Sequence, residues 1–179
     1  MIIIPGWLIS IATFPGVIVH EAAHLLFCRI RRLAVFEVVF FRVGNPAGYV
    51  VHEVTEDFRS QFLVAMGPFF VNSALCVLFC AAAFVPVSEL GLADPLAYFF
   101  YWLGLSIGMH AIPSNQDMKG LWRLMPAAAK RLSPLAIISY PIVGLVYVLN
   151  LARFFWADLI YGLAIGIWAP LALFHWLGG

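Results

Sequence analysis

The sequence predicts an all-α polytopic membrane protein with about five transmembrane helices and a short β-hairpin between the first two helices. Of its 179 residues, 64% are hydrophobic and only 11% are charged, whereas about 25% are charged in an average soluble domain. With a mean hydropathy of +0.98, the chain has too few polar side chains to cover a soluble surface. Several apolar runs also approach the length of about 20 residues that a spanning helix needs. The expected solvent is therefore a lipid bilayer.

Five apolar runs are the candidate spans. The first is broken by Pro5 and Pro15, and we expect it to stay in the mature chain because no basic segment precedes it as in a cleavable signal peptide. Arg153 and Asp158 separate the last two, and a polar connection over residues 113–133 follows the third. The runs cover Ile2–Ile30, Phe62–Val85, Leu96–Ile112, Leu135–Ala152 and Leu159–Leu177.

A hairpin is expected between the first and second runs. Two β-rich segments, Val35–Val43 and Tyr49–Val54, flank the turn-forming residues 44–48. Such a pattern is typical of paired strands around a loop rather than of a membrane span.

Charge and cysteine content exclude two classes of protein. A formal net charge of +1 leaves no basic face for a nucleic-acid partner. The cysteines are odd in number and stand inside apolar runs, so we expect small buried apolar side chains and no disulfide framework. They are Cys28, Cys76 and Cys80.

The distribution of basic residues predicts the orientation, because Lys and Arg are retained on the cytoplasmic side during insertion. With the N-terminus outside, Arg153 alone of the ten basic residues lies outside. The end of the first helix, the hairpin and the polar connection then lie at the cytoplasmic face. The nine cytoplasmic basic residues are Arg29, Arg31, Arg32, Arg42, Arg59, Lys119, Arg123, Lys130 and Arg131.

The first run contains the sequence HEAAH at residues 20–24, an HExxH pattern. Two histidines four residues apart lie on one helical face, so His20 and His24 can bind a single zinc ion. Glu21 lies beside them and can act as a general base toward the attacking water. The alternative is a structural polar cluster. Three ionisable groups so close together in a membrane helix are costly unless they are paired or bound to a ligand, which favours a Zn²⁺ site.

Two imidazoles and one water leave tetrahedral zinc one protein ligand short. His110 and Asp117 qualify, because they lie at the end of the third run and just beyond it, in the cytoplasmic half that also holds the two histidines. His52 or Glu53 on the hairpin is a weaker alternative. His175 stands among apolar and aromatic residues in the last run, which is more typical of an interfacial histidine.

Over roughly residues 8–125 the chain resembles the site-2 protease family of intramembrane zinc metalloproteases. The resemblance rests on HEAAH in the first helix, the β-rich insert, Gly67-Pro68 followed by Asn72 in the second helix, and Asn115-Gln116-Asp117 after the third. It implies that Asp117 is the third zinc ligand and that Asn72 lies near the active site, where it contacts substrate. It also implies one membrane-embedded metalloprotease domain over residues 1–179, with a core at about 8–125 and accessory helices at about 134–177.

The chain departs from the family pattern in two places. Gln116 and Met118 stand where the family motif has proline and glycine, so His110 stays open as the third ligand. The gap from Gly67 to Asn72 is one residue longer than in the family, so Asn72 can equally be a helix-packing amide.

The expected function is that of an intramembrane zinc metalloendopeptidase, which hydrolyses peptide bonds in or near transmembrane segments of other membrane proteins. A helical substrate must first be unwound, and the hairpin either pairs with the unwound segment or only covers the membrane surface. Two alternatives stay open: a membrane-bound zinc protease of juxtamembrane or soluble peptides, and a non-enzymatic membrane metal-binding protein. Compactness and the resemblance favour a prokaryotic plasma membrane.

Overall fold

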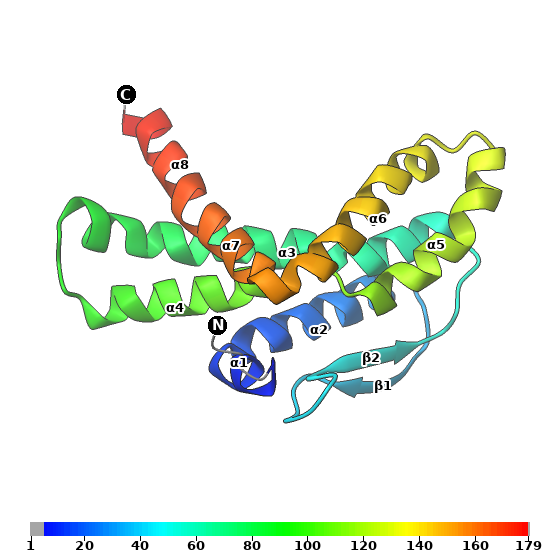
Figure 1. The fold of residues 1–179 in the computed structure, drawn as a ribbon, viewed down its shortest axis with the longest axis horizontal. Coiled ribbons are helices and arrows are strands. Elements are labelled where there is room, and N and C mark those ends of the chain that lie inside the picture. The colour runs from blue at the N-terminus through cyan, green and yellow to red at the C-terminus, as the bar shows by residue number, and fades with distance from the viewer. Residues whose placement is uncertain (1–5, 179) are drawn as a thin grey trace.

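The computed structural model describes residues 6–178, and its helices carry one small two-stranded sheet along one side (Figure 1). Pro5 and the start of the first apolar run, from Ile2, lie outside the described residues. The helices are α1 (Gly6–Ala12), α2 (Phe14–Ile30), α3 (Phe58–Phe84), α4 (Pro95–Met109), α5 (Asn115–Lys130), α6 (Pro134–Ala152), α7 (Ala157–Leu163) and α8 (Ala169–Gly178). The strands are β1 (Val35–Val39) and β2 (Tyr49–His52).

The first apolar run is not one straight helix. α1 and α2 meet at 86°, and Thr13 between them donates its hydroxyl to the Ile9 carbonyl at 2.7 Å. Pro15 follows in the first turn of α2, where a missing N–H breaks no helical hydrogen bond. The HEAAH sequence therefore lies on α2 alone, well past the bend.

The expectation of about five spans is too high for the described residues. Three helices are long and apolar enough to cross a membrane, or up to four if α1 and α2 form one broken span. α4 is not among them: it has 15 residues and extends over about 22 Å, short of a hydrocarbon core of about 30 Å. The three are Phe58–Glu89, Pro134–Phe155 and Ala157–Trp176.

The polar connection after the third run is itself a helix, α5. Ser114 caps its first turn: the Asp117 N–H donates to the Ser114 hydroxyl, and the Ser114 N–H donates to the Asp117 carboxylate. The helix has an apolar face that packs against α3 and α6, where Met118, Leu121 and Met125 are fully buried. Because its other face carries Lys, Arg and Gln, its composition had predicted only a polar connection.

The predicted hairpin is present but shorter than expected. β1 and β2 are antiparallel, with Val39 opposite Tyr49 and Val35 opposite His52. It lies alongside α2 (Figure 1). An irregular register between Val35 and Glu37 interrupts the ladder.

Small residues allow the helices to approach closely. A Cβ on Gly104 or Gly108 of α4 would stand 2.6 Å from the sulfur of Cys80 or Cys76 of α3. Close contact of this kind is the usual basis of helix association in lipid. All three cysteines are buried and unbridged, as the sequence had predicted.

Candidate metal centre

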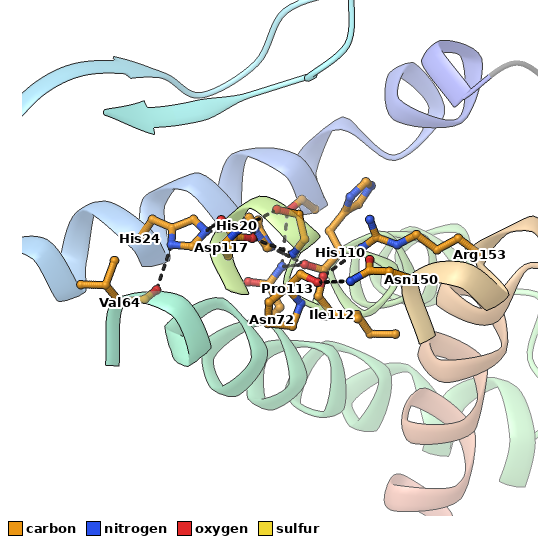
Figure 2. A network of polar contacts seen from close by, with 12 residues as sticks. His20, His24, Val64, Asn72, His110, Ile112, Pro113, Asp117, Asn150 and Arg153 are labelled. Carbon is orange, nitrogen blue, oxygen red and sulfur yellow. Dashed lines mark hydrogen bonds and ion pairs between the residues drawn. The ribbon is translucent and has the colours of Figure 1, made fainter. Parts of the chain in front are cut away.

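The two histidines of HEAAH face the same point. They lie one turn apart on α2, and their Nε2 atoms are 3.2 Å from each other. Their rings meet edge to face with centroids 4.8 Å apart. Figure 2 shows both side chains directed from α2 toward the first turn of α5.

Asp117 completes a three-residue cluster. Its Oδ1 lies 3.4 Å from Nε2 of His24, and its Oδ2 lies 3.8 Å from Nε2 of His20. Bonds of about 2.0–2.2 Å to tetrahedral zinc would place ligand atoms about 3.3–3.5 Å apart. The two distances to Asp117 involve different carboxylate oxygens. With one ligand atom taken from each residue, the atoms of His20, His24 and Asp117 all lie within 4.8 Å of one another, so the cluster could hold a metal ion.

Backbone carbonyls determine which nitrogen of each histidine faces the cluster. Nδ1 of His24 donates to the Val64 carbonyl at 2.9 Å, and Nδ1 of His20 donates to the His110 carbonyl at 2.6 Å. A carbonyl can only accept, so a neutral ring must carry its proton on Nδ1. Both Nε2 atoms then present lone pairs to each other and to the Asp117 carboxylate, an arrangement that favours a cation between them.

Asp117 is held as a carboxylate. Its Oδ2 accepts the Ser114 N–H at 2.7 Å, an interaction that fixes the side chain at the first turn of α5. A hydrogen bond from a backbone N–H favours the charged form of a carboxyl group. The charged, acceptor-only form is the one that binds a metal.

Glu21 lies beside the cluster and is 8% exposed. Its side chain contacts the hairpin at Gly48: a Cβ there would stand 2.7 Å from Cγ of Glu21 and 3.0 Å from two hairpin carbonyls. Glycine is therefore needed for the hairpin to pass this close to α2. The contact limits how far the Glu21 side chain can move toward the hairpin.

The structure brings Asp117, and not His110, to the two histidines. Nε2 of His110 instead pairs with the Thr13 hydroxyl at 2.8 Å. The hairpin candidates are elsewhere too: Nδ1 of His52 pairs with the Glu53 carbonyl, and the Glu53 carboxylate accepts the N–H of Ala34. His175 pairs with the Leu171 carbonyl of its own helix.

Asn72 is fully buried where α2, α3 and α4 meet. Its Nδ2 donates to the carbonyls of Ile107 and His110, at 3.1 and 3.2 Å, and it does not line the cavity beside the cluster. These contacts are those of a helix-packing amide. Contact between Asn72 and a substrate stays a prediction.

A cavity of about 1650 Å³ lies beside the cluster. Its walls come from α2, the loop and second strand of the hairpin, the first turns of α5, and the segment that joins α6 to α7. Glu21, both histidines and Asp117 all line it. A peptide could therefore reach the candidate metal centre and Glu21 together.

Three polar residues near this centre had not been assigned to the site from the sequence. Gln61 of α3 is 8% exposed and lines the cavity, and it packs against Gly120, where a Cβ would clash with its amide. Asn150 and Arg153 donate to backbone carbonyls just before α5. A lone amide or charge at the end of an apolar run gives no periodic signal, and Arg153 had been interpreted only as a loop charge.

Comparison of the chain with protein-family models, with curated proteins and with solved structures found no match.

Proposed function

We propose that the chain is a membrane-embedded zinc endopeptidase that hydrolyses peptide bonds in or near transmembrane segments. The observation that carries the proposal is the convergence of two imidazole Nε2 atoms and one carboxylate on one point, beside Glu21 and a large cavity. Two nitrogens and one oxygen, with a fourth position open, form the ligand set of catalytic zinc sites. The first helix, hairpin, Gly67-Pro68 helix and Asp117 also follow the order of the site-2 protease family, and we propose membership of that family.

The residues of the site have two separate roles in the proposed hydrolysis, metal binding and proton transfer. His20, His24 and Asp117 would hold the ion, which when bound supplies Lewis acidity toward a carbonyl and toward water. Glu21 accepts one proton from the attacking water as the C–O bond forms. It then returns that proton to the departing amine as the C–N bond breaks, so the carboxylate is regenerated.

The hairpin supplies a surface for an extended substrate. Four residues of β2, from Tyr49 to His52, line the cavity, and β2 pairs with β1 on one side only within the described residues. Its other edge can receive a strand of substrate by backbone hydrogen bonds. A transmembrane helix must unwind to use that edge, because its own hydrogen bonds otherwise occupy its carbonyls.

The orientation follows from the basic residues. We place the ends of α2 and α5 on the cytoplasmic side, with the N-terminus outside, since Arg29, Arg31, Lys130 and Arg131 lie at these two helix ends. The metal centre, between the middle of α2 and the start of α5, then opens toward the cytoplasmic half of a prokaryotic plasma membrane.

Elemental analysis of detergent-purified protein tests the proposal first. Wild type should contain about one zinc per chain, and the double variant His20→Ala, His24→Ala should contain none. Glu21→Gln should retain zinc and lose cleavage of labelled single-span peptides in proteoliposomes, because the amide cannot accept the proton. The proposal would be contradicted if wild type bound no zinc after zinc was added back. It would also be contradicted if the Glu21→Gln variant cleaved the peptides.

The same assays separate the two alternatives. A protease of juxtamembrane or soluble peptides would cut labelled casein and leave the single-span peptides intact. A metal-binding protein without enzymatic activity would bind zinc and cut neither.

A further inference from the structure

The end of α6 and the segment that joins it to α7 contact the connection between α4 and α5. Nη2 of Arg153 donates to the Ile112 carbonyl at 3.0 Å. Nδ2 of Asn150, one turn earlier, donates to the next carbonyl, that of Pro113, also at 3.0 Å. Figure 2 shows both side chains converging on this short stretch of backbone. Two residues of the accessory helices therefore hold two consecutive carbonyls of a distant segment.

That segment positions two of the three candidate ligands. At its start, the His110 carbonyl accepts Nδ1 of His20. At its end, Ser114 binds the Asp117 carboxylate through its backbone N–H and caps the helix that carries it. A shift of the Ile112 and Pro113 carbonyls would therefore move His20 and Asp117 relative to each other.

The two carbonyls depend on these side chains. Ile112 and Pro113 are almost completely buried, and they follow the end of α4, where carbonyls lack helical partners. A buried carbonyl without a donor is destabilising. Asn150 serves mainly as a donor here, since its Oδ1 is buried with no partner among the described residues.

Arg153 is held in place in turn. Its guanidinium forms an ion pair with Asp158 at 2.9 Å. Trp156, between the two, has a left-handed backbone with φ of 63°, and its N–H closes a tight turn onto the Arg153 carbonyl at 2.9 Å. The turn thus orients the guanidinium toward the connection that follows α4.

We propose that Arg153 and Asn150 are positioning residues of the metal centre, through which the accessory helices α6 and α7 set its metal affinity. The inference rests on the metal centre of the proposed function but does not require cleavage. Loss of a group that bonds a metal ligand directly typically changes metal affinity 10–100-fold, and Arg153 and Asn150 hold the segment that supplies two such groups, the His110 carbonyl and the Ser114 N–H. Any partner that displaces α6 or α7 would change the metal affinity by the same route.

Cobalt titration of metal-free, full-length protein in detergent tests this inference. Visible absorption reports both the affinity for Co²⁺ and the ligand geometry. Arg153→Ala should weaken binding about tenfold or more and change the spectrum, and Asn150→Ala should act in the same direction. Arg153→Lys, which keeps a donor and a charge, should recover part of the affinity.

Arg123→Ala is the matched control. This arginine also lines the cavity and forms an ion pair, with Glu56 at 3.0 Å, but its backbone contact is to Thr55. It should bind Co²⁺ as wild type does. If Arg153→Ala loses helical circular dichroism, Asn150→Ala decides the question.

The outcomes separate the two proposals. Wild-type affinity and spectrum in folded Arg153→Ala and Asn150→Ala would overturn the positioning role and leave the metal centre standing. A wild type that binds no Co²⁺ would overturn the metal centre itself. Equal losses in Arg153→Ala and Arg123→Ala would also overturn the positioning role, because a general effect of charge removal would explain them.

Discussion

At the scale of single residues, backbone carbonyls determine which nitrogen of each histidine faces the candidate metal centre. The Val64 and His110 carbonyls each require the proton on Nδ1, which leaves the Nε2 lone pairs of His20 and His24 free. Neither partner can be found from the sequence, because a carbonyl is present at every residue and only the fold selects one. The histidines themselves were predictable, since HExxH places both on one helical face.

The third candidate ligand shows the same limit. The sequence left His110 and Asp117 open, because they lie at the end of the third apolar run and just beyond it. The structure distinguishes the two candidates. Ser114 caps α5 and directs Asp117 toward the cluster, while the His110 side chain turns to Thr13. The sequence does contain the capping pattern, because Ser114 stands three residues before the acidic Asp117. It does not show where this helix start lies relative to α2.

Gly48 gives a prediction at this scale. Gly48→Ala should lower peptide cleavage about tenfold or more while zinc content stays at the wild-type value. The added methyl group meets the Glu21 side chain and two hairpin carbonyls, so either Glu21 or the hairpin must move, and small displacements of catalytic groups are costly. Cleavage rate and zinc content are measured on the same sample.

Gly44→Ala is the control for Gly48→Ala. It lies in the same loop, but the nearest atom to its added Cβ is 4.0 Å away, at the end of the Arg42 side chain. It should cleave as wild type does. Equal cleavage by both variants and wild type would show that the contact between Gly48 and Glu21 is not needed.

At the scale of elements, hydropathy predicted where helices form but not how long they are. The second, fourth and last apolar runs became α3, α6 and the pair α7–α8. α4 is shorter than its apolar run because it ends at Met109, where the chain turns toward α5. α5 was missed as a helix because its composition is polar, although it buries an apolar face. Length and partners of a helix are set by tertiary packing, which composition does not encode.

The start of α3 yields a prediction about pH. The Asp57 carboxylate accepts hydrogen bonds from the hydroxyl and N–H of Ser60 and from Arg31. Hydrogen bonding from Ser60 outweighs the effect of burial and holds the pKa of Asp57 below its usual range. The stabilisation is therefore present above the unfolded-state pKa of about 3.9 and is lost as pH falls through the lower folded-state value.

Asp57→Ala should lower the free energy of unfolding by about 1 kcal/mol at pH 7, as is typical for loss of an N-cap. The difference from wild type should shrink below about pH 4, where Asp57 of the unfolded chain takes up a proton, and vanish below the lower folded-state pKa, where the folded carboxylate is protonated too. Unfolding in denaturant, with chelator in every sample to remove the contribution of metal, measures it. A difference that grows as pH falls would contradict this account of the cap.

At the scale of the whole molecule, the candidate metal centre joins most of the bundle. Its ligands come from α2 and α5, and their outer contacts come from α3 and from the connection after α4. The α6–α7 turn holds that connection in place. Elements that are distant in sequence therefore meet at one point, where a bound ion would add a cross-link between α2 and α5.

Metal removal should accordingly destabilise the entire fold rather than one helix. An ion that binds only the folded chain stabilises it by about 2.7 kcal/mol when its free concentration is one hundred times its Kd. For a chain of this size, that loss lowers Tm by about 5–10 °C. Thermal unfolding in detergent, followed by circular dichroism with zinc and then with excess chelator, measures the shift. The double variant His20→Ala, His24→Ala should have the same Tm under both conditions, whereas an equal chelator shift in both proteins would show that the metal acts elsewhere.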